Sequence, residues 1–268
     1  GVPGADEVIA VEAPPDLLSV GMHYADFTAT DDDTVAQTLA ELRDRPPAHG
    51  GQAYDDRVQI PAGRALVEGR LTVPTCARGV VVFAHGSGSS RRSPRNIAVA
   101  EQLNALGLGT LLVDLLDPSE ADDRSRTFDI PLLAGRLATV TAWLSVHRAV
   151  AGLAVGWFGA STGAAAALWA AAEPGSRVAA VVSRGGRPDL AESRLSEVRV
   201  PTLLIVGSAD PGVLALNRSA LVKLRGPASL HVVPDATHLF EEPGALDEVA
   251  EVAGHWFREH LRGTVSAQ

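Results

Sequence analysis

The sequence predicts an α/β fold, in which a mostly parallel central sheet of about eight strands carries helices on both faces. From residue 57 onward, strand-like segments alternate with segments of helical length, which is typical of βαβ units. Several strand-like segments, such as Val80-Val81-Val82-Phe83, are apolar throughout, as parallel strands buried on both faces usually are. With 268 residues and a hydrophobic fraction of 46%, the chain can fill the core of one large domain or two small ones.

The expected elements follow one another along the chain, separated by turn-forming residues such as Gly and Pro. We expect strands at residues 57–60, 65–72, 79–84, 109–114, 153–158, 178–183, 202–206 and 229–233. We expect helices at residues 95–106, 132–146, 162–172, 213–224 and 246–261. Their alternation is the basis of the predicted fold class.

The first fifty residues differ from the rest of the chain. The acidic residues 31–33 are expected to cap a helix over residues 34–43, because carboxylates favour a helix N-terminus. Residues 46–51 are rich in Pro and Gly and indicate a linker. We therefore expect an N-terminal extension with its linker at residues 1–50 and an α/β domain at residues 51–268.

Composition excludes several classes of partner. The formal net charge of −9 disfavours nucleic acid and an anionic membrane surface as partners. The single cysteine, Cys76, cannot form an internal disulfide or a cysteine-built zinc site. Neither a membrane-spanning apolar run nor a signal peptide is evident, and the chain begins at Gly1 without a methionine. We expect a cytoplasmic protein without metal or cofactor. Its composition is compatible with a homo-oligomer as well as with a monomer.

The segment Gly159-Ala160-Ser161-Thr162-Gly163 is the most informative motif of the chain. An apolar strand precedes it and an alanine-rich helix follows it, which is the context of a nucleophile elbow. Glycines on both sides would let the strand and the helix approach closely while the Ser161 hydroxyl stays exposed in a strained turn. We expect Ser161 to be a catalytic nucleophile.

A serine nucleophile needs a base, and the base needs an acid that orients it. Asp210 follows the predicted strand at 202–206, and His238 follows the predicted strand at 229–233. Catalytic groups of parallel sheets lie at the carboxyl ends of the strands, so Ser161, Asp210 and His238 should converge. Asp235 is the competing acid, although its place three residues before His238 favours a turn residue. Asp114 also ends a strand, and we expect it to cap a loop.

The segment His85-Gly86-Ser87-Gly88-Ser89-Ser90 follows the predicted strand at 79–84 directly. Loops at this position supply a backbone N–H to an oxyanion hole, and we expect the donors to be the amides of Ser87 and Thr162. The alternative is a phosphate-binding loop, but the glycine and lysine spacing of the known phosphate-binding motifs is absent.

Together, the motifs at 85–88, 159–163, 207–210 and 236–238 resemble the α/β-hydrolase family, and within it the dienelactone hydrolases. The resemblance covers residues 55–262 and implies the α/β-hydrolase fold with a Ser-Asp-His triad. Dienelactone hydrolases proper carry cysteine as the nucleophile, whereas this chain has Ser161. Residues 1–48 resemble the tail of phosphoribosyltransferase domains that are fused upstream of such hydrolases. Their ribose-phosphate-binding loop is absent, so we expect no phosphoribosyl transfer by this chain.

We therefore expect a carboxylesterase that cleaves small carboxylic esters. The alternatives are a lactone hydrolase of the dienelactone type and a non-catalytic scaffold module of a phosphoribosyltransferase fusion. Arg91, Arg184 and Arg187 follow strand ends and could bind a substrate carboxylate, or they could form surface salt bridges. The charged segment at 117–128 is the candidate for a short mobile flap. The natural ester remains open.

Overall fold

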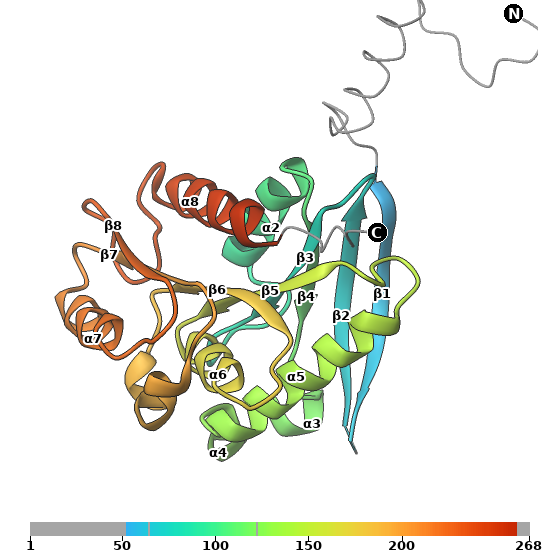
Figure 1. The fold of residues 1–268 in the computed structure, drawn as a ribbon, viewed down its shortest axis with the longest axis horizontal. Helices are drawn as coiled ribbons and strands as arrows, with labels where there is room; N and C mark the ends of the chain where they lie inside the picture. Colours follow the sequence, from blue (N-terminus) through green and yellow to red (C-terminus); the bar gives the residue numbers. More distant parts are fainter. Residues whose placement is uncertain (1–51, 64, 122, 262–268) are drawn as a thin grey trace, which may run out of the picture. The chain divides into compact units, whose positions relative to one another are not determined.

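The computed structural model describes residues 52–63, 65–121 and 123–261 (Figure 1). The N-terminal extension at 1–50 and its expected helix at 34–43 lie outside the described residues. Within them, a single sheet has the strand order β1-β2-β4-β3-β5-β6-β7-β8. The pairs β1–β2 and β2–β4 are antiparallel and all other neighbouring pairs are parallel. The predicted eight-stranded, mostly parallel sheet is thereby confirmed.

The strand bounds agree with the predicted segments to within a few residues, except for the first strand. The strands are β1 (Gln52–Ala62), β2 (Ala65–Pro74), β3 (Gly79–Ala84), β4 (Gly109–Val113), β5 (Ala154–Ala160), β6 (Val178–Arg184), β7 (Thr202–Gly207) and β8 (Ala228–Val233). The prediction for β1 was too short because its polar residues Asp55, Asp56 and Arg57 do not resemble a strand. They are exposed on the outermost strand, where Asp55 accepts hydrogen bonds from Arg70 and Thr72 of β2.

Within the described residues, the five helices predicted between residues 95 and 261 are present, and three further helical segments were not predicted. The predicted ones are α2 (Pro94–Ala105), α5 (Ile130–Val146), α6 (Thr162–Ala171), α7 (Pro211–Leu221) and α8 (Ala245–His260). The additional ones are the single-turn helices α3 (Pro118–Ala121) and α4 (Arg124–Thr127) and the 3₁₀ helix η2 (Pro188–Glu197). These three are short or irregular, so helical periodicity gives little signal for them.

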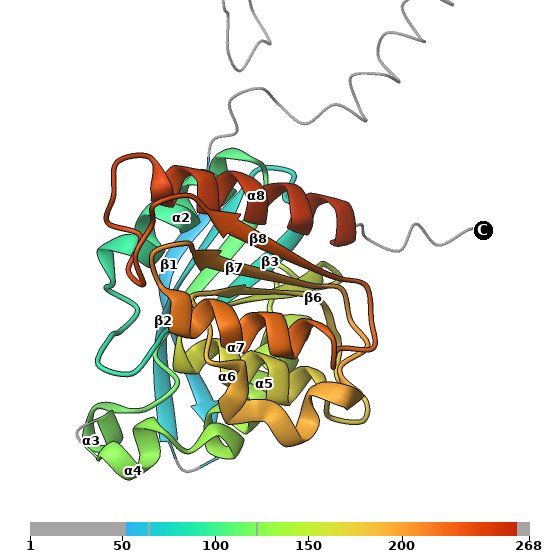
Figure 2. The same ribbon diagram turned by 90° about the vertical axis from the view of Figure 1, so that its left-hand side faces the viewer.

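Helices cover both faces of the sheet, as the sequence predicts. α2 and α8 lie on one face, and α5, α6 and α7 lie on the other (Figures 1 and 2). Strand residues therefore alternate between two buried clusters: Val80 and Val82 pack with the α5 and α6 side, and Val81 and Phe83 pack with the α2 and α8 side. α6 is rich in fully buried alanines, whose small side chains let the helix approach the sheet closely.

The arrangement of the sheet positions the loops that matter for function. β3 to β8 all run parallel, so the loops that follow β3, β4, β5, β6, β7 and β8 emerge at one edge. This carboxyl edge carries every residue that the sequence predicts for the site. Among the described residues, none of the helices combines the length and the apolar character that crossing a bilayer requires.

Candidate active site

Ser161 occupies a sharp turn between β5 and α6. Its backbone angles are φ 50° and ψ −116°, a region that non-glycine residues rarely adopt. A Cβ atom on Gly159 would lie 2.4 Å from the Cα atom of Ala164, and one on Gly163 would lie 2.1 Å from the carbonyl oxygen of Ala84. Both glycines are therefore required by close backbone approach, as expected for a nucleophile elbow.

The strained turn is held from the neighbouring strand. The Ser161 N–H donates to the carbonyl oxygen of Arg184 over 3.3 Å, and the Ser161 carbonyl accepts from the Arg187 N–H over 3.2 Å. These hydrogen bonds join the elbow to the end of β6 and the segment after it. Such external support is what a strained backbone conformation needs in order to persist.

Asp210 and His238 form a hydrogen-bonded pair beside this turn. The Asp210 carboxylate accepts a hydrogen bond from Nδ1 of His238 over 2.8 Å. A carboxylate only accepts, so Nδ1 carries a proton, and in the neutral imidazole Nε2 is left as the acceptor. The other Asp210 oxygen accepts from the Val213 N–H and caps α7. One carboxylate thus fixes both the start of a helix and the orientation of an imidazole.

His238 and Ser161 rest against the same turn at the end of β6. A Cβ atom on Gly185 would lie 3.5 Å from Nδ1 of His238, while the preceding residue, Arg184, binds the Ser161 amide. Among the described residues, the Ser161 hydroxyl makes no hydrogen bond to His238. In unliganded enzymes such contacts are often long and tighten only when substrate binds.

The two other candidates for the acid, Asp235 and Asp114, have structural roles. Asp235 lies in a left-handed turn with φ 56°, and its N–H donates to the Ser208 hydroxyl. Asp114 accepts from the backbone N–H and the guanidinium of Arg91, so it caps the loop after β3, as expected.

The loop after β3 lies directly over Ser161. A Cβ atom on Gly86 would be 3.1 Å from the Cβ atom of Ser161. The Ser87 N–H donates to the hydroxyl of the buried Thr162 over 2.8 Å. Sequence reasoning missed this contact, because nothing local links residues 75 positions apart. The Thr162 amide occupies the first position of α6, where helices leave N–H groups without an intrahelical partner.

The comparison with protein families decides what kind of protein carries this geometry. The model of the dienelactone hydrolase family matches residues 67–261. The chain belongs to the dienelactone hydrolase family. A dienelactone hydrolase from Anabaena variabilis with a crystal structure is 53% identical; the match covers 78% of this chain and 99% of that one, with a TM-score of 0.75. Family and structure together show the α/β-hydrolase fold.

Other relatives extend the comparison. Est1E from Butyrivibrio proteoclasticus shares the fold at 15% identity and a TM-score of 0.65, covering 76% of this chain and 98% of that one. Two curated proteins of Mycobacterium tuberculosis, from strains CDC 1551 and H37Rv, are 53% identical over 266 residues and are provisionally named phosphoribosyl transferases. The matches cover 97% of this chain but 60% of those proteins. Their name agrees with the predicted resemblance of residues 1–48 to a fused domain.

This member of the dienelactone hydrolase family keeps two of its three candidate arginines in internal ion pairs. The Arg91 guanidinium binds both Asp114 and Glu68. The Arg187 guanidinium binds Asp189 in a bidentate manner, over 2.8 and 2.7 Å. Binding of a substrate carboxylate by these residues stays a prediction, and each would have to exchange an existing partner.

Arg184 is different, because it is buried without a carboxylate partner among the described residues. Its guanidinium lies 3.4 Å from the Asn96 amide oxygen and 5.7 Å from the centre of the Phe240 ring. Burial, followed by the charge of Arg95, lowers the pKa of the Arg184 guanidinium to about 10. The unfolded chain holds this proton more tightly, so the charge disfavours folding below pH 10, and the penalty fades as the pH rises above 10.

We therefore expect Arg184→Met to raise the free energy of unfolding at pH 7 by about 1 to 3 kcal/mol. Urea denaturation measures this change. Arg187→Met is the control, since its half-exposed ion pair should contribute less than about 1 kcal/mol. A less stable Arg184→Met variant would mean that the buried charge is compensated after all.

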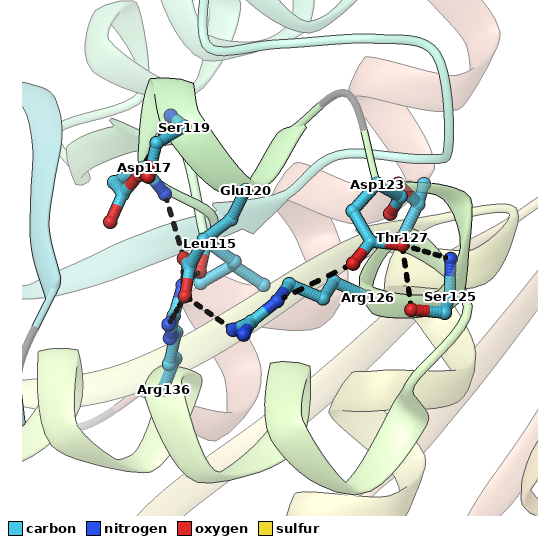
Figure 3. A network of polar contacts seen from close by, with 9 residues as sticks. All are labelled: Leu115, Asp117, Ser119, Glu120, Asp123, Ser125, Arg126, Thr127 and Arg136. Atoms are coloured by element: carbon cyan, nitrogen blue, oxygen red, sulfur yellow. Dashed lines mark hydrogen bonds and ion pairs between the residues drawn. The ribbon is translucent and has the colours of Figure 1, made fainter.

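The segment expected to form a flap contains α3 and α4, and a polar network anchors it to α5 (Figure 3). The buried Arg136 of α5 binds the Glu120 carboxylate with both terminal nitrogens and donates to the Leu115 carbonyl over 2.8 Å. Arg126 of α4 binds the same carboxylate over 2.7 Å. The Arg136 guanidinium lowers the pKa of the Glu120 carboxyl. Glu120 thus connects both short helices to the body of the domain.

Proposed function

We propose that this protein is a serine esterase that cleaves small carboxylic esters through an acyl-enzyme intermediate. The observation that carries the proposal is the placement of the strained Ser161 and the hydrogen-bonded Asp210–His238 pair against one turn at the end of β6. A nucleophile, a base and an orienting acid are the three groups that acyl transfer by serine requires.

In the first step, Nε2 of His238 takes the proton of the Ser161 hydroxyl while the oxygen attacks the ester carbonyl. The resulting tetrahedral intermediate collapses as His238 gives that proton to the leaving alcohol oxygen. A water molecule then loses a proton to His238 and attacks the acyl-enzyme. This releases the acid and returns the proton to Ser161. Asp210 stays ionised throughout and stabilises the charged imidazole.

The negative charge of the intermediate would be stabilised by the amides of Ser87 and Thr162. The Thr162 amide lies at the positive end of α6, which favours an anion. The Ser87 amide lies beside it but donates to the Thr162 hydroxyl, so it would have to exchange that acceptor for the oxyanion. Losing one such donor typically reduces transition-state stabilisation by about 3 to 4 kcal/mol.

The decisive test combines hydrolysis of 4-nitrophenyl esters, from acetate to decanoate, with labelling by an organophosphate. We expect turnover that is highest for the shorter chains and covalent modification confined to Ser161, detected by peptide mass spectrometry. Labelling of another residue, or an active protein that is never labelled, would contradict the proposal.

The lactone hydrolase of the dienelactone type is the second candidate, because the family includes such enzymes and the Anabaena variabilis relative is named as one. Two features weigh against it: Ser161 stands where dienelactone hydrolases proper have cysteine, and Arg91 and Arg187 already pair with internal carboxylates. Hydrolysis of a dienelactone faster than of any 4-nitrophenyl ester would favour it. A folded chain without activity in either assay would favour the scaffold module.

A further inference from the structure

A cavity of about 270 Å³ lies beside the loop that covers Ser161, and we call it the β3–β4 cavity. It opens between the ends of β3 and β4 and the short helices α3 and α4. Its lining consists of Glu68, His85, Gly88, Ser89, Ser90, Arg91, Asp114, Leu116, Pro118, Ala121 and Thr127. A larger hollow of about 530 Å³ runs along β1 and β2 and contains neither Ser161 nor His238. Neither hollow is lined by Ser161 or His238, but the β3–β4 cavity is lined by His85 and Gly88 of the loop that covers Ser161.

The strand order places this cavity and the proposed base on opposite sides of Ser161. β3 and β4 precede β5 in the sheet order, whereas β7 and β8, which carry Asp210 and His238, follow it. The link between cavity and nucleophile is the loop after β3: His85 and Gly88 line the cavity, and Gly86 between them touches Ser161.

This geometry assigns the two halves of an ester to the two sides of Ser161. The base must reach both the Ser161 hydroxyl and the leaving oxygen, so the alcohol half belongs on the His238 side. The acyl half then extends past the oxyanion donors towards the loop after β3. We propose that the β3–β4 cavity binds the acyl group and selects acyl groups that carry no negative charge. This inference rests on the proposed esterase function.

The size of the cavity limits the acyl group. The cavity measures about 270 Å³, many times the roughly 10 to 15 Å³ that a single water molecule needs. Leu116, Pro118 and Ala121 supply apolar surface on the side of α3. Short alkyl and single-ring acyl groups fit a cavity of this size and lining.

The charges of the lining determine whether the cavity favours anionic or uncharged acyl groups. Two carboxylates, Glu68 and Asp114, face one guanidinium, that of Arg91, whose two terminal nitrogens bind one carboxylate each. Apart from His85, whose Nε2 lies 3.5 Å from the Asp114 carboxylate, the lining holds two carboxylates and one guanidinium that both of them bind. A carboxylate on the acyl group would lose water and meet like charges without a partner. An uncharged acyl group of the same shape would be neither stripped of a charged group's water nor repelled by the carboxylates.

The test compares 4-nitrophenyl 5-methylhexanoate with 4-nitrophenyl hemiglutarate, two esters of nearly equal shape that differ in a terminal isopropyl or carboxylate group. Each rate is corrected for the background measured with Ser161→Ala. We expect kcat/KM to be at least tenfold higher for the uncharged ester. In Glu68→Gln, which removes one negative charge from the lining, the ratio of the two values should shrink at least threefold.

Glu259→Gln provides the matched control, because Glu259 is an exposed residue of α8 that does not line the cavity. It should leave the ratio unchanged. A wild-type protein that hydrolyses both esters equally well, or a ratio that does not respond to Glu68→Gln, overturns the inference and leaves the esterase proposal intact. A protein that hydrolyses neither ester contradicts both.

Discussion

Replacing Ser161 with alanine is expected to lower kcat for 4-nitrophenyl butyrate by about 10⁴- to 10⁶-fold, the range seen when a serine nucleophile is removed. The remaining rate would come from binding and from the oxyanion donors. Alanine differs from serine only by the hydroxyl, so the strained backbone at φ 50° is affected little. The free energy of unfolding should therefore change by less than about 1 kcal/mol. Steady-state kinetics and urea denaturation measure the two effects.

Ser145→Ala is the matched control for this experiment. Ser145 is an exposed residue of α5 whose hydroxyl donates only to the Ala142 carbonyl. Its removal is expected to leave kcat unchanged. If Ser161→Ala retained a tenth of the wild-type activity, another group would have to be the nucleophile, and the proposed mechanism would be wrong.

Replacing Asp210 with asparagine is expected to lower kcat by about 10³- to 10⁴-fold. The asparagine amide can donate to Nδ1 of His238, which would move the imidazole proton to Nε2 and leave no acceptor for the Ser161 proton. Its side-chain oxygen can still accept from the Val213 N–H and cap α7. Stability should thus stay within about 1 kcal/mol of the wild-type value. The measurement is kcat across the pH range, together with thermal unfolding.

Asp235→Asn makes the same chemical change three residues before His238 and serves as the control. Asp235 occupies a left-handed turn, a conformation that asparagine tolerates well. We expect nearly wild-type kcat for this variant. A large loss in Asp235→Asn with little change in Asp210→Asn would reverse the assignment of the acid.

The sequence predicted those parts of the site that depend on local pattern. Gly159 and Gly163 could be assigned because a strand, a sharp turn and a helix in succession need residues without side chains at fixed positions. Asp210 and His238 could be assigned because each directly follows an apolar strand, and parallel strands end at one edge of their sheet. In these cases a short stretch of chain is enough to explain why each residue was assigned to the site.

Contacts between distant segments could not be predicted in this way. The short helices α3 and α4 depend on Glu120 meeting Arg136, 16 positions away, because two single turns are too short to be stable by propensity alone. The surroundings of the candidate arginines likewise depend on the fold. Arg91 binds Glu68 and Asp114, and Arg184 is buried against Phe240. Sequence spacing does not encode the distance between two charges on different elements.

The sequence by itself determined the fold class and the order of the elements, and it predicted the residues of the candidate triad. Hydrophobic patterns and glycine positions act within a few residues of each other, so the local chain is enough to specify them. Only the tertiary structure decided that Ser87 donates to Thr162, which arginines are paired and that a cavity lies beside the loop that covers Ser161. These features arise where loops from separate strands meet, and the packing of the sheet and its helices sets those distances.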